Sequence, residues 1–461
     1  MPSFLFTGLT KDTSRNIAAF FFLAVLVFFW TYGFQRRDYL FVHDAMNYWS
    51  ARYNFIDNGQ FSILHYNSPL RGYLFPLLLF LIQWQADVLG IDAQMLFLTY
   101  SALFVSVLAF YLLPWFFRVV FEWKTPVIKR LLFSGLLFFF WRGHFLYPLT
   151  DFPSLAFLLL GIGIFVRIGL GSLKPAWAVL AGFAIGAAVN IRPVYQVSLV
   201  VVLVLLCCLW RRLGKKDVLI SVVFFFFGAG MVFYPQLLIN QLYFETNSPL
   251  VLSTYIEDES IYEIQLFWGL KTQKYETNIG DDYPFASVVY RDPLADKLPQ
   301  RFLRDKTTQG YINIIRSYPL EVAVSYFRHF FNGLDVFFST PYVRKIYAGH
   351  FLLSFANYLI WFLALYYMIA HTAERVTCSS FGVVLAMLAP VALAVPIVVE
   401  VRFFLPMYLL AYGIVSYGLN YKEMLLYILR TKSTFLLIVL LLFGWMLVCF
   451  TLSAGTIEKL Q

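Results

Sequence analysis

Acidic and basic side chains suited to group-transfer chemistry stand at the ends of long apolar runs in this sequence. Asp44 follows the first apolar run, and Asp151 directly precedes a later one. A carboxylate at a membrane surface can accept the proton of an attacking hydroxyl. Arg192 and Arg402 also flank apolar runs, and guanidinium groups bind phosphate oxygens through paired hydrogen bonds. We therefore expect a site at a membrane surface, where a hydroxyl arrives from one side and a reactive group carried by a lipid arrives from the other.

Each of the two carboxylates also has a simpler explanation. Asp44 could cap a helix that begins at Ala45, because Asp is a preferred N-cap residue. Thr150, Asp151 and Pro153 together form a good helix start. A capping role and a chemical role are compatible at Asp44, so the sequence leaves both open.

The composition identifies the class of protein that must position these residues. Of the 461 residues, 60% are hydrophobic and only 13% are charged, whereas a soluble domain carries nearly twice that share of charge. Apolar runs of about 18 residues or more are typical of transmembrane helices. We therefore predict an all-α polytopic membrane protein with a single membrane domain. The first run, 16–34, lacks a small-residue cleavage site after it and is predicted to be a retained helix.

The net charge of +9 does not indicate a nucleic-acid partner, because the basic residues cluster in short loops, where they act as orientation signals. The four cysteines lie in or beside apolar runs, and no disulfide framework or metal-ligand spacing is visible. We expect membrane lipids as partners, no nucleic acid, no metal and no cofactor.

Twelve apolar runs can be placed with the rule that positive loops stay on the cytoplasmic side. They fall at 16–34, 73–90, 94–118, 131–147, 153–170, 176–191, 194–210, 217–237, 350–370, 381–399, 403–420 and 434–452. If 73–90 crosses, the basic loops 124–130 and 211–216 fall outside, against the rule. If 73–90 lies at the outer interface, every short basic loop faces the cytoplasm. The sequence thus predicts about eleven transmembrane helices and a cytoplasmic N-terminus.

Two external segments follow from this arrangement. Residues 35–93 form the first external loop with interfacial helices, and 238–345 form a larger external loop or cap, in which 318–331 reads as an amphipathic helix lying in the interface. The same arrangement gathers several charged side chains near the external face. These are Asp44, His65, Arg71, Arg142, His144, Asp151, Arg192, Glu400 and Arg402. Charges at membrane depth are costly, so this gathering predicts a site there.

Three segments resemble the GT-C superfamily of polyprenyl-phosphate-sugar-dependent glycosyltransferases. They are the first loop (43–48, 58–62 and 67–73), the segment 147–155 with its acid before a helix, and 400–406 with its Glu-x-Arg-Phe-x-x-Pro pattern. Weaker matches are 182–193 and 235–249. The chain departs from the family in having one Asp in the first loop where protein mannosyltransferases have an Asp-Glu pair. It also lacks the Asp-x-Asp metal pair of oligosaccharyltransferases, so we expect no metal.

The resemblance implies an integral membrane glycosyltransferase that works with inversion at the anomeric carbon. It would transfer a sugar from a lipid-linked donor to a glycan or glycolipid acceptor. By analogy, we expect a bacterial inner-membrane enzyme whose active site faces the periplasm and whose product is a surface glycan such as the O-antigen of lipopolysaccharide. Asp44 and Asp151 are the expected catalytic residues. The expected substrate-binding residues are Arg192, Arg402, Glu400, Arg71, Arg142, Tyr48 and His65.

Three other functions stay open at the level of the sequence. A transporter or flippase of lipid-linked sugars would explain the helices and arginines, but predicts polar residues near the membrane centre and a repeat between halves. An O-antigen polymerase or ligase would use arginines and a late external loop, but does not explain Asp44. A structural membrane scaffold is the third.

Overall fold

The computed structural model of the protein describes residues 11–36, 41–202, 214–254, 260–298, 307–371 and 378–461. In this part of the chain, seven helices are long and apolar enough to cross a membrane. They are Arg15–Gln35, Ala93–Phe121, Asp151–Gly169, Lys215–Phe244, Phe351–Ala370, Val401–Gly418 and Lys432–Ile457. These helices identify the chain as a mainly α-helical integral membrane protein. The number of about eleven spans stays a prediction.

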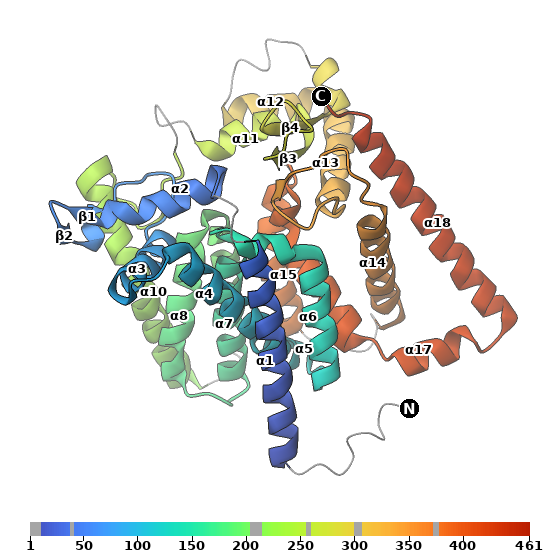
Figure 1. The fold of residues 1–461 in the computed structure, drawn as a ribbon, viewed down its shortest axis with the longest axis horizontal. Coiled ribbons are helices and arrows are strands. Elements are labelled where there is room, and N and C mark those ends of the chain that lie inside the picture. Colours follow the sequence, from blue (N-terminus) through green and yellow to red (C-terminus); the bar gives the residue numbers. More distant parts are fainter. Residues whose placement is uncertain (1–10, 37–40, 203–213, 255–259, 299–306, 372–377) are drawn as a thin grey trace.

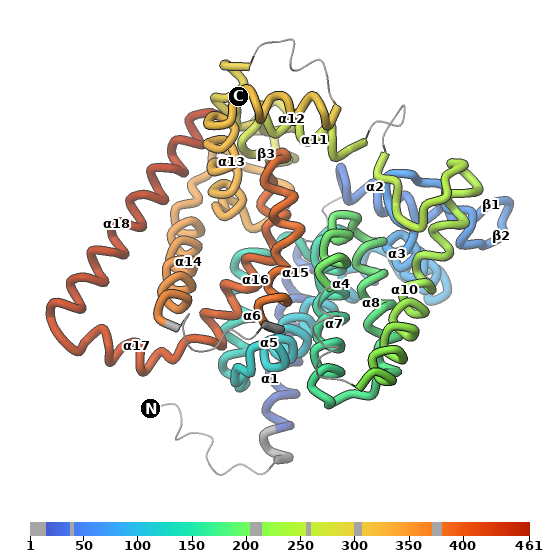
Figure 2. The backbone as a smooth tube through the Cα atoms, turned by 180° about the vertical axis from the view of Figure 1, so that it is seen from behind, coloured from blue at the N-terminus to red at the C-terminus, as the bar shows by residue number. Residues whose placement is uncertain are grey.

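Most of the long helices stand side by side in an upright bundle (Figure 1). They are α1 (Lys11–Gln35), α4 (Ala93–Val107), α5 (Leu113–Phe121), α6 (Val127–Trp141), α7 (Asp151–Gly169), α8 (Ala178–Ile191), α10 (Lys215–Phe244), α14 (Phe351–His371), α15 (Cys378–Ala394) and α16 (Leu405–Gly413). A π-helical turn, Leu108–Leu112, joins α4 to α5. At the C-terminal side, α17 (Tyr421–Ile428) leads into the slanted α18 (Lys432–Ile457), which meets α14 near its upper end (Figure 2).

Close helix packing holds α8 against α10. A Cβ atom on Gly182 would lie 2.0 Å from the carbonyl oxygen of Phe225, and one on Gly228 would lie 1.9 Å from that of Val179. Only glycine permits this approach, since any side chain would force the two backbones apart. Small residues at such positions are typical of helix pairs in membranes.

The described part of the external segment folds into a small cap above the bundle. It contains α11 (Ile261–Gly269), β3 (Thr272–Asn278), β4 (Ser287–Arg291), η9 (Pro293–Asp296), α12 (Thr308–Ser317), α13 (Pro319–Gly333) and β5 (Tyr342–Val343). The strands form one sheet in the order β4-β3-β5, with β3 antiparallel to β4 and parallel to β5. The predicted amphipathic helix 318–331 corresponds to α13, and its outward residues Leu320, Val324 and Phe327 are apolar. We call the end of the bundle that carries this sheet the cap end.

The first loop lies at the cap end. It contains α2 (His43–Ala51), η2 (Arg52–Phe55), the hairpin β1 (Ile56–Asp57) and β2 (Gln60–Phe61), η3 (Ile63–His65) and α3 (Leu74–Leu89). Figure 1 shows α2 running across the upright helices, with α3 below it. Leu74 N donates to Asn190 near the end of α8, and Trp30 near the end of α1 donates to Thr99 near the start of α4. Thus α3 begins and ends on one side of the bundle, as the charge rule predicted for 73–90.

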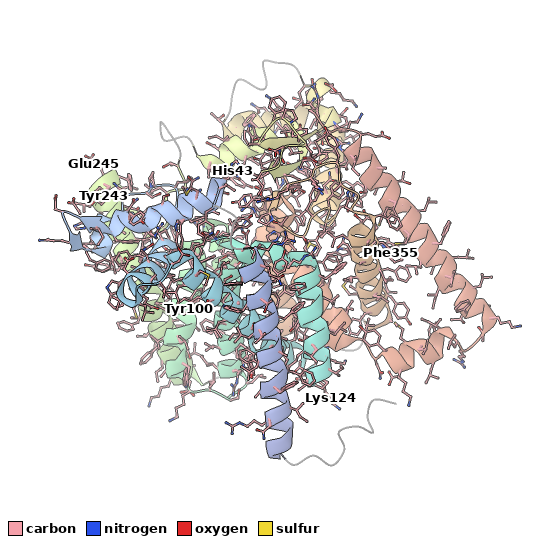
Figure 3. The ribbon with its side chains drawn as sticks, in the orientation of Figure 1. His43, Tyr100, Lys124, Tyr243, Glu245 and Phe355 are labelled. Carbon is pink, nitrogen blue, oxygen red and sulfur yellow. The ribbon has the colours of Figure 1, made fainter. Side chains whose placement is uncertain are left out.

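The two ends of the bundle differ in the loops they carry. His43 and Glu245 lie at the cap end, whereas Lys124, in a short basic loop, lies at the opposite end (Figure 3). The orientation of these two ends relative to the membrane stays a prediction from the charge rule. Arg211, Arg212 and Arg375 of the predicted basic loops lie outside the described residues.

Two predicted helix ends are wrong because the chain leaves the helix to contact the cap. The run 131–147 ends as an α-helix at Trp141 and continues as the 3-10 turn η5 (Arg142–Leu146). There, Gly143 N donates to Ser339 O, and a Cβ on Gly143 would strike Thr340. The run 381–399 ends at Ala394, and Val398 and Val399 then bond to α11 and β3 through their backbones. Hydropathy does not mark the second change, because residues 395–399 are all apolar, whereas Arg142 and His144 interrupt the first run.

The helix α10 extends past the predicted start of the external segment at 238 and continues through Phe244. The amides Gln236 and Asn240 end the apolar run in the sequence, but both are fully buried and hydrogen-bonded. Paired amides fit inside a helical bundle, because their polar atoms need no water. The run 194–210 is described only through Val202, and its remainder lies outside the described residues.

Candidate active site

A cavity of about 560 Å³ opens at the cap end, where the first loop, the bundle and the cap meet. It contains three carboxylates and three guanidinium groups that the sequence places far apart. These are Asp44, Asp151 and Glu400, with Arg71, Arg192 and Arg402. Their formal charges cancel, so the empty site is close to neutral.

Asp44 lies between two of the arginines. Its Oδ1 accepts a hydrogen bond from Arg71 Nη2 at 2.9 Å, and its Oδ2 accepts one from Arg402 Nη2 at 3.0 Å. Burial by itself would raise the pKa of Asp44, but the charges of Arg402 and Arg71 outweigh it and hold the pKa below its usual range. The side chain is still 43% exposed. Asp44 is therefore ionised at neutral pH and accessible from the cavity.

The other carboxylates complete a chain of ion pairs around Arg402. Glu400 accepts hydrogen bonds from Arg402 Nε at 2.7 Å and from its Nη2 at 3.2 Å. Asp151 Oδ2 lies 3.9 Å from Arg402 Nη1, and Asp151 also pairs with Arg192. The guanidinium of Arg192 lies 5.1 Å from the ring centre of Phe403. Arg402 thus links all three carboxylates of the site.

The ends of four helical elements place these side chains. Asp44 is in the first turn of α2, Asp151 begins α7, Arg192 follows α8, and Arg402 is in the 3-10 turn η11 (Val401–Phe404) before α16. Helices that run in opposite directions can bring such residues together only at a shared end of a bundle. The site therefore follows from the up-and-down order of the helices.

Asp44 does not serve as the helix cap that the sequence allowed, whereas the predicted helix start at Thr150 and Asp151 is confirmed, since α7 begins at Asp151. The N-cap of α2 is Val42 and that of α7 is Thr150, and neither makes a side-chain capping bond. The carboxylate of Asp44 bonds to Arg71 and Arg402 in the lining of the cavity instead. His43, just before it, has a φ of +48°. A non-glycine residue in this left-handed region is strained, and such strain clusters at functional sites.

A chain of buried amides fixes the loop that carries Arg71. Asn190 donates to Gln236, and Gln236 donates to Asn240, each at 2.9 Å. Asn240 in turn donates to the carbonyls of the 248–250 loop at 2.7 Å. At the other end, a Cβ on Gly72 would lie 2.0 Å from Asn190 O, so only glycine lets the loop approach. This network couples the position of Arg71 to α8 and α10.

Apolar side chains also line the cavity. They include Val194 and Val197 from the apolar helix Pro193–Val202, and Pro390, Leu393 and Ala394 from α15. Leu405 at the start of α16 lies on the same lining. A ligand in this cavity would therefore meet both paired charges and apolar side chains.

The structure separates the predicted site residues into two groups. Tyr48 lies in the cavity with the six charged residues, and its ring lies 4.5 Å from the guanidinium of Arg71. Arg142 and His65 do not line the cavity: Arg142 donates to Phe139 O, and His65 ends the 3-10 turn η3. His144 is buried against Trp141, and burial lowers its pKa to about 3.

Sequence reasoning missed two aromatic residues of the site. Phe403 lies within 6 Å of both Arg192 and Arg402, at 5.1 and 5.7 Å from ring centre to guanidinium carbon. The Tyr342 hydroxyl accepts a hydrogen bond from Ala45 N at 3.0 Å and so holds the first turn of α2 against the cap. The sequence placed Phe403 in the Glu-x-Arg-Phe-x-x-Pro pattern but gave it no role in the site. None singled out Tyr342.

In the described residues, no group of three or more His, Cys, Asp and Glu side chains is arranged to hold a metal ion. Each carboxylate of the site pairs with an arginine instead. The arrangement suits a ligand that brings its own negative charge, because such a ligand can exchange with the carboxylates for the guanidinium groups.

No protein-family model matches this chain, and neither a curated protein nor a solved structure matches it. Membership of the GT-C superfamily therefore stays a prediction drawn from the motifs around Asp44, Asp151 and Glu400.

Proposed function

We propose that this chain is an integral membrane glycosyltransferase. It transfers a sugar from a polyprenyl-phosphate donor to a glycan or lipid-linked acceptor on the external, periplasmic face of a bacterial inner membrane. The observation that carries the proposal is the cavity lining, which combines arginines and a partly exposed carboxylate with apolar side chains from membrane helices. A lipid-linked sugar phosphate needs both the charged and the apolar groups.

The arginines are the proposed ligands of the donor phosphate. Arg71, Arg192 and Arg402 bring three positive charges to one cavity, and guanidinium groups stay ionised in a site with little water. The prenyl chain would lie along the apolar lining formed by Val194, Val197 and Leu393. Binding of the donor would draw Arg71 and Arg402 toward the phosphate and away from Asp44.

That exchange would prepare Asp44 for its role as general base. Without a donor, the two arginines keep the pKa of Asp44 low, so the carboxylate is ionised but weakly basic. When the arginines turn to the phosphate, the pKa of Asp44 rises toward the range in which a base removes protons effectively. The site would thus couple donor binding to activation of the acceptor.

The transfer is a single displacement with inversion. The acceptor oxygen forms a bond to the anomeric carbon while the bond from that carbon to the phosphate oxygen breaks. The hydroxyl proton passes to Asp44, and the electron pair of the broken bond leaves with the polyprenyl phosphate, whose charge the arginines offset. Asp151 holds Arg192 and, with Glu400, orients Arg402.

The test compares cells that make the wild-type protein with cells that make Asp44→Asn or no protein. Mass spectrometry of surface glycans and of lipid-linked sugars is the measurement. We expect the glycan modification to disappear in both altered strains, while the lipid-linked donor accumulates. The control is Asp57→Asn, which makes the same change at an exposed residue of the same loop and should preserve the modification.

Two results would contradict the proposal. One is a normal glycan profile with Asp44→Asn present in membranes at the wild-type amount. The other is an unchanged glycan profile without the protein, together with lipid-linked sugars redistributed across the membrane, which would identify a flippase. A transporter of this kind would bind its cargo near the membrane centre, whereas five of the six charges here lie at or next to helix ends and Arg71 lies in the loop before α3.

A further inference from the structure

A second cavity, of about 480 Å³, lies on the outside of the cap. Its base is the outward face of the β3–β4 hairpin, where Tyr275 pairs in register with Val289. Trp268, at the end of α11, forms one wall and is 54% exposed. The centres of the Trp268 and Tyr275 rings are 6.5 Å apart, and their planes differ by 30°. Two large rings, tilted by 30° to each other, therefore lie beside the same exposed hollow.

Hydrogen-bonding groups surround these rings. Ser287 and Arg291 project from the same face of β4 as Val289, and Lys271 follows α11 directly. The hydroxyls of Tyr275 and Ser287 lie 3.2 Å apart, so they form one polar edge. Arg291 pairs with Asp296, but both side chains are exposed, and such pairs exchange easily with a ligand.

This cavity shares a wall with the candidate active site. Val398 lines the second cavity, and its backbone N donates to the carbonyl of Gln265, which lines the first. Tyr275 N in turn donates to Val399 O at 2.9 Å. The extended chain before Glu400 therefore separates the two cavities, and a long ligand on the outside of the cap would pass close to the reaction site.

We propose that this second cavity binds a segment of carbohydrate chain. Pyranose rings have an apolar face that packs on an aromatic ring, and a rim of hydroxyls that needs donors and acceptors at the side. Trp268 and Tyr275 supply the first, and Lys271, Ser287 and Arg291 supply the second. The cavity would hold sugar units of the acceptor away from the reacting hydroxyl. Only this last step depends on the proposed transferase function.

The probe is an array of immobilised oligosaccharides from bacterial surface polysaccharides, incubated with the labelled full-length protein in detergent. We expect wild-type protein to bind a subset of the oligosaccharides and Trp268→Ala to lose at least about tenfold of that signal. The matched control is Trp177→Ala, which removes a Trp of similar exposure, 49%, from η6 (Pro175–Trp177) before α8. That control should bind like wild type.

Isothermal titration with the best-bound oligosaccharide then tests the rim, where Arg291→Gln and Lys271→Gln should each weaken binding severalfold. Trp268→Phe, which keeps an aromatic face, should retain more binding than Trp268→Ala and so separates loss of stacking from misfolding. Binding to no oligosaccharide, or equal binding by wild type and Trp268→Ala, would overturn the site. Asp44→Asn should bind the oligosaccharides like wild type, because Asp44 does not line the second cavity. A failure of the transferase proposal would therefore not change the binding result.

Discussion

Two of the charged clusters in the described part of the chain differ in whether they open to a cavity. The candidate active site is lined by ion pairs that face a cavity, with Asp44 43% exposed. The cap holds a second cluster around Asp292, which is fully buried. Asp292 accepts hydrogen bonds from Leu294 N at 2.7 Å and from Ser325 Oγ and Arg328 Nε at 3.0 Å. Both clusters are paired, but only the first can exchange a partner for a ligand.

The same closure is seen around Lys274 on β3. Its ammonium group donates to Asp335 O at 2.8 Å, lies 3.6 Å from Glu276 and sits over the ring of Phe337 at 3.2 Å. Lys274 has no exposed surface, so neither solvent nor a ligand can reach it to replace these partners in the folded protein. Comparison of the clusters teaches that buried charge alone does not indicate a functional site. Accessibility of the paired groups from a cavity is the feature that distinguishes one from the other.

The largest expected effect separates activity from stability at Asp44. Asp44→Asn should lower kcat about 10³-fold, because the loss of a general base removes this order of rate enhancement. The melting temperature should change by only a few degrees, because the carboxylate is partly exposed and its partners can turn to solvent. Donor turnover and thermal unfolding of the purified protein measure the two quantities. A large fall in stability would make Asp44 a structural residue like Asp292.

The opposite result is expected at Asp292. Asp292→Asn should destabilise the protein by about 3 kcal/mol, because it leaves Arg328 beside a buried group that no longer carries charge. The activity of the fraction that stays folded should equal that of wild type. Thermal unfolding and active-site-normalised kcat check both statements. Loss of kcat with normal stability would show that the cap cluster takes part in the reaction.

A smaller effect tests whether the site uses arginine geometry or charge alone. Arg71→Lys should raise the KM for the donor about tenfold with less change in kcat, because lysine keeps the charge but loses the planar pairing and the stacking on Tyr48. Steady-state kinetics measure both constants. Arg142→Lys serves as the matched control, since Arg142 does not line the cavity, and equal effects of the two variants would contradict the assignment.

The smallest expected effect concerns the pH dependence of the closed cluster. Burial raises the pKa of Glu276 to about 7 in spite of the nearby Lys274, whereas an unfolded Glu titrates near 4.5. A raised pKa contributes stability that is fully present below about 4.5 and is lost as the pH rises through about 7. Glu276→Gln should therefore reduce the fall in melting temperature between pH 5 and 8 by about 1–2 °C.

Thermal unfolding of wild type and Glu276→Gln across this pH range is the measurement. Glu263→Gln, which changes a partly exposed helix residue of the cap, is the control, and its pH profile should follow wild type. An identical pH profile for wild type and Glu276→Gln would show that Glu276 is ionised throughout. The Lys274 cluster would then not differ from the candidate active site in how burial affects its charges.

Much of the candidate site could be predicted because hydropathy and charge are local properties. Asp44 stood out as an acid between apolar runs, and Asp151, Arg192, Glu400 and Arg402 each lie at the end of one. These signals give the depth of a residue along the bundle but not its direction around a helix. For that reason Arg142 was predicted beside the others, although it points to Phe139 and Phe138 instead.

The aromatic residues show the same limit. Among the 51 Phe of the chain, the pattern at 400–406 set Phe403 apart, but it did not predict that this ring packs on two arginines. The cap was predicted only as a polar segment with one amphipathic helix. Its sheet joins β3 to β5 across 60 residues or more, and such pairing depends on contacts that local patterns do not contain.

The sequence by itself determined that this is a helical membrane protein with charged residues gathered near one side, because the bilayer imposes length and hydropathy on every span. Only the tertiary structure decided which charges meet. Arg402 bonds to Asp44 across 358 positions of the chain, and it does so because the start of α2 and the turn η11 lie at the same corner of the bundle. Packing between helices fixes that contact. The same packing leaves the charges around Asp44 open to a cavity and closes off those around Asp292.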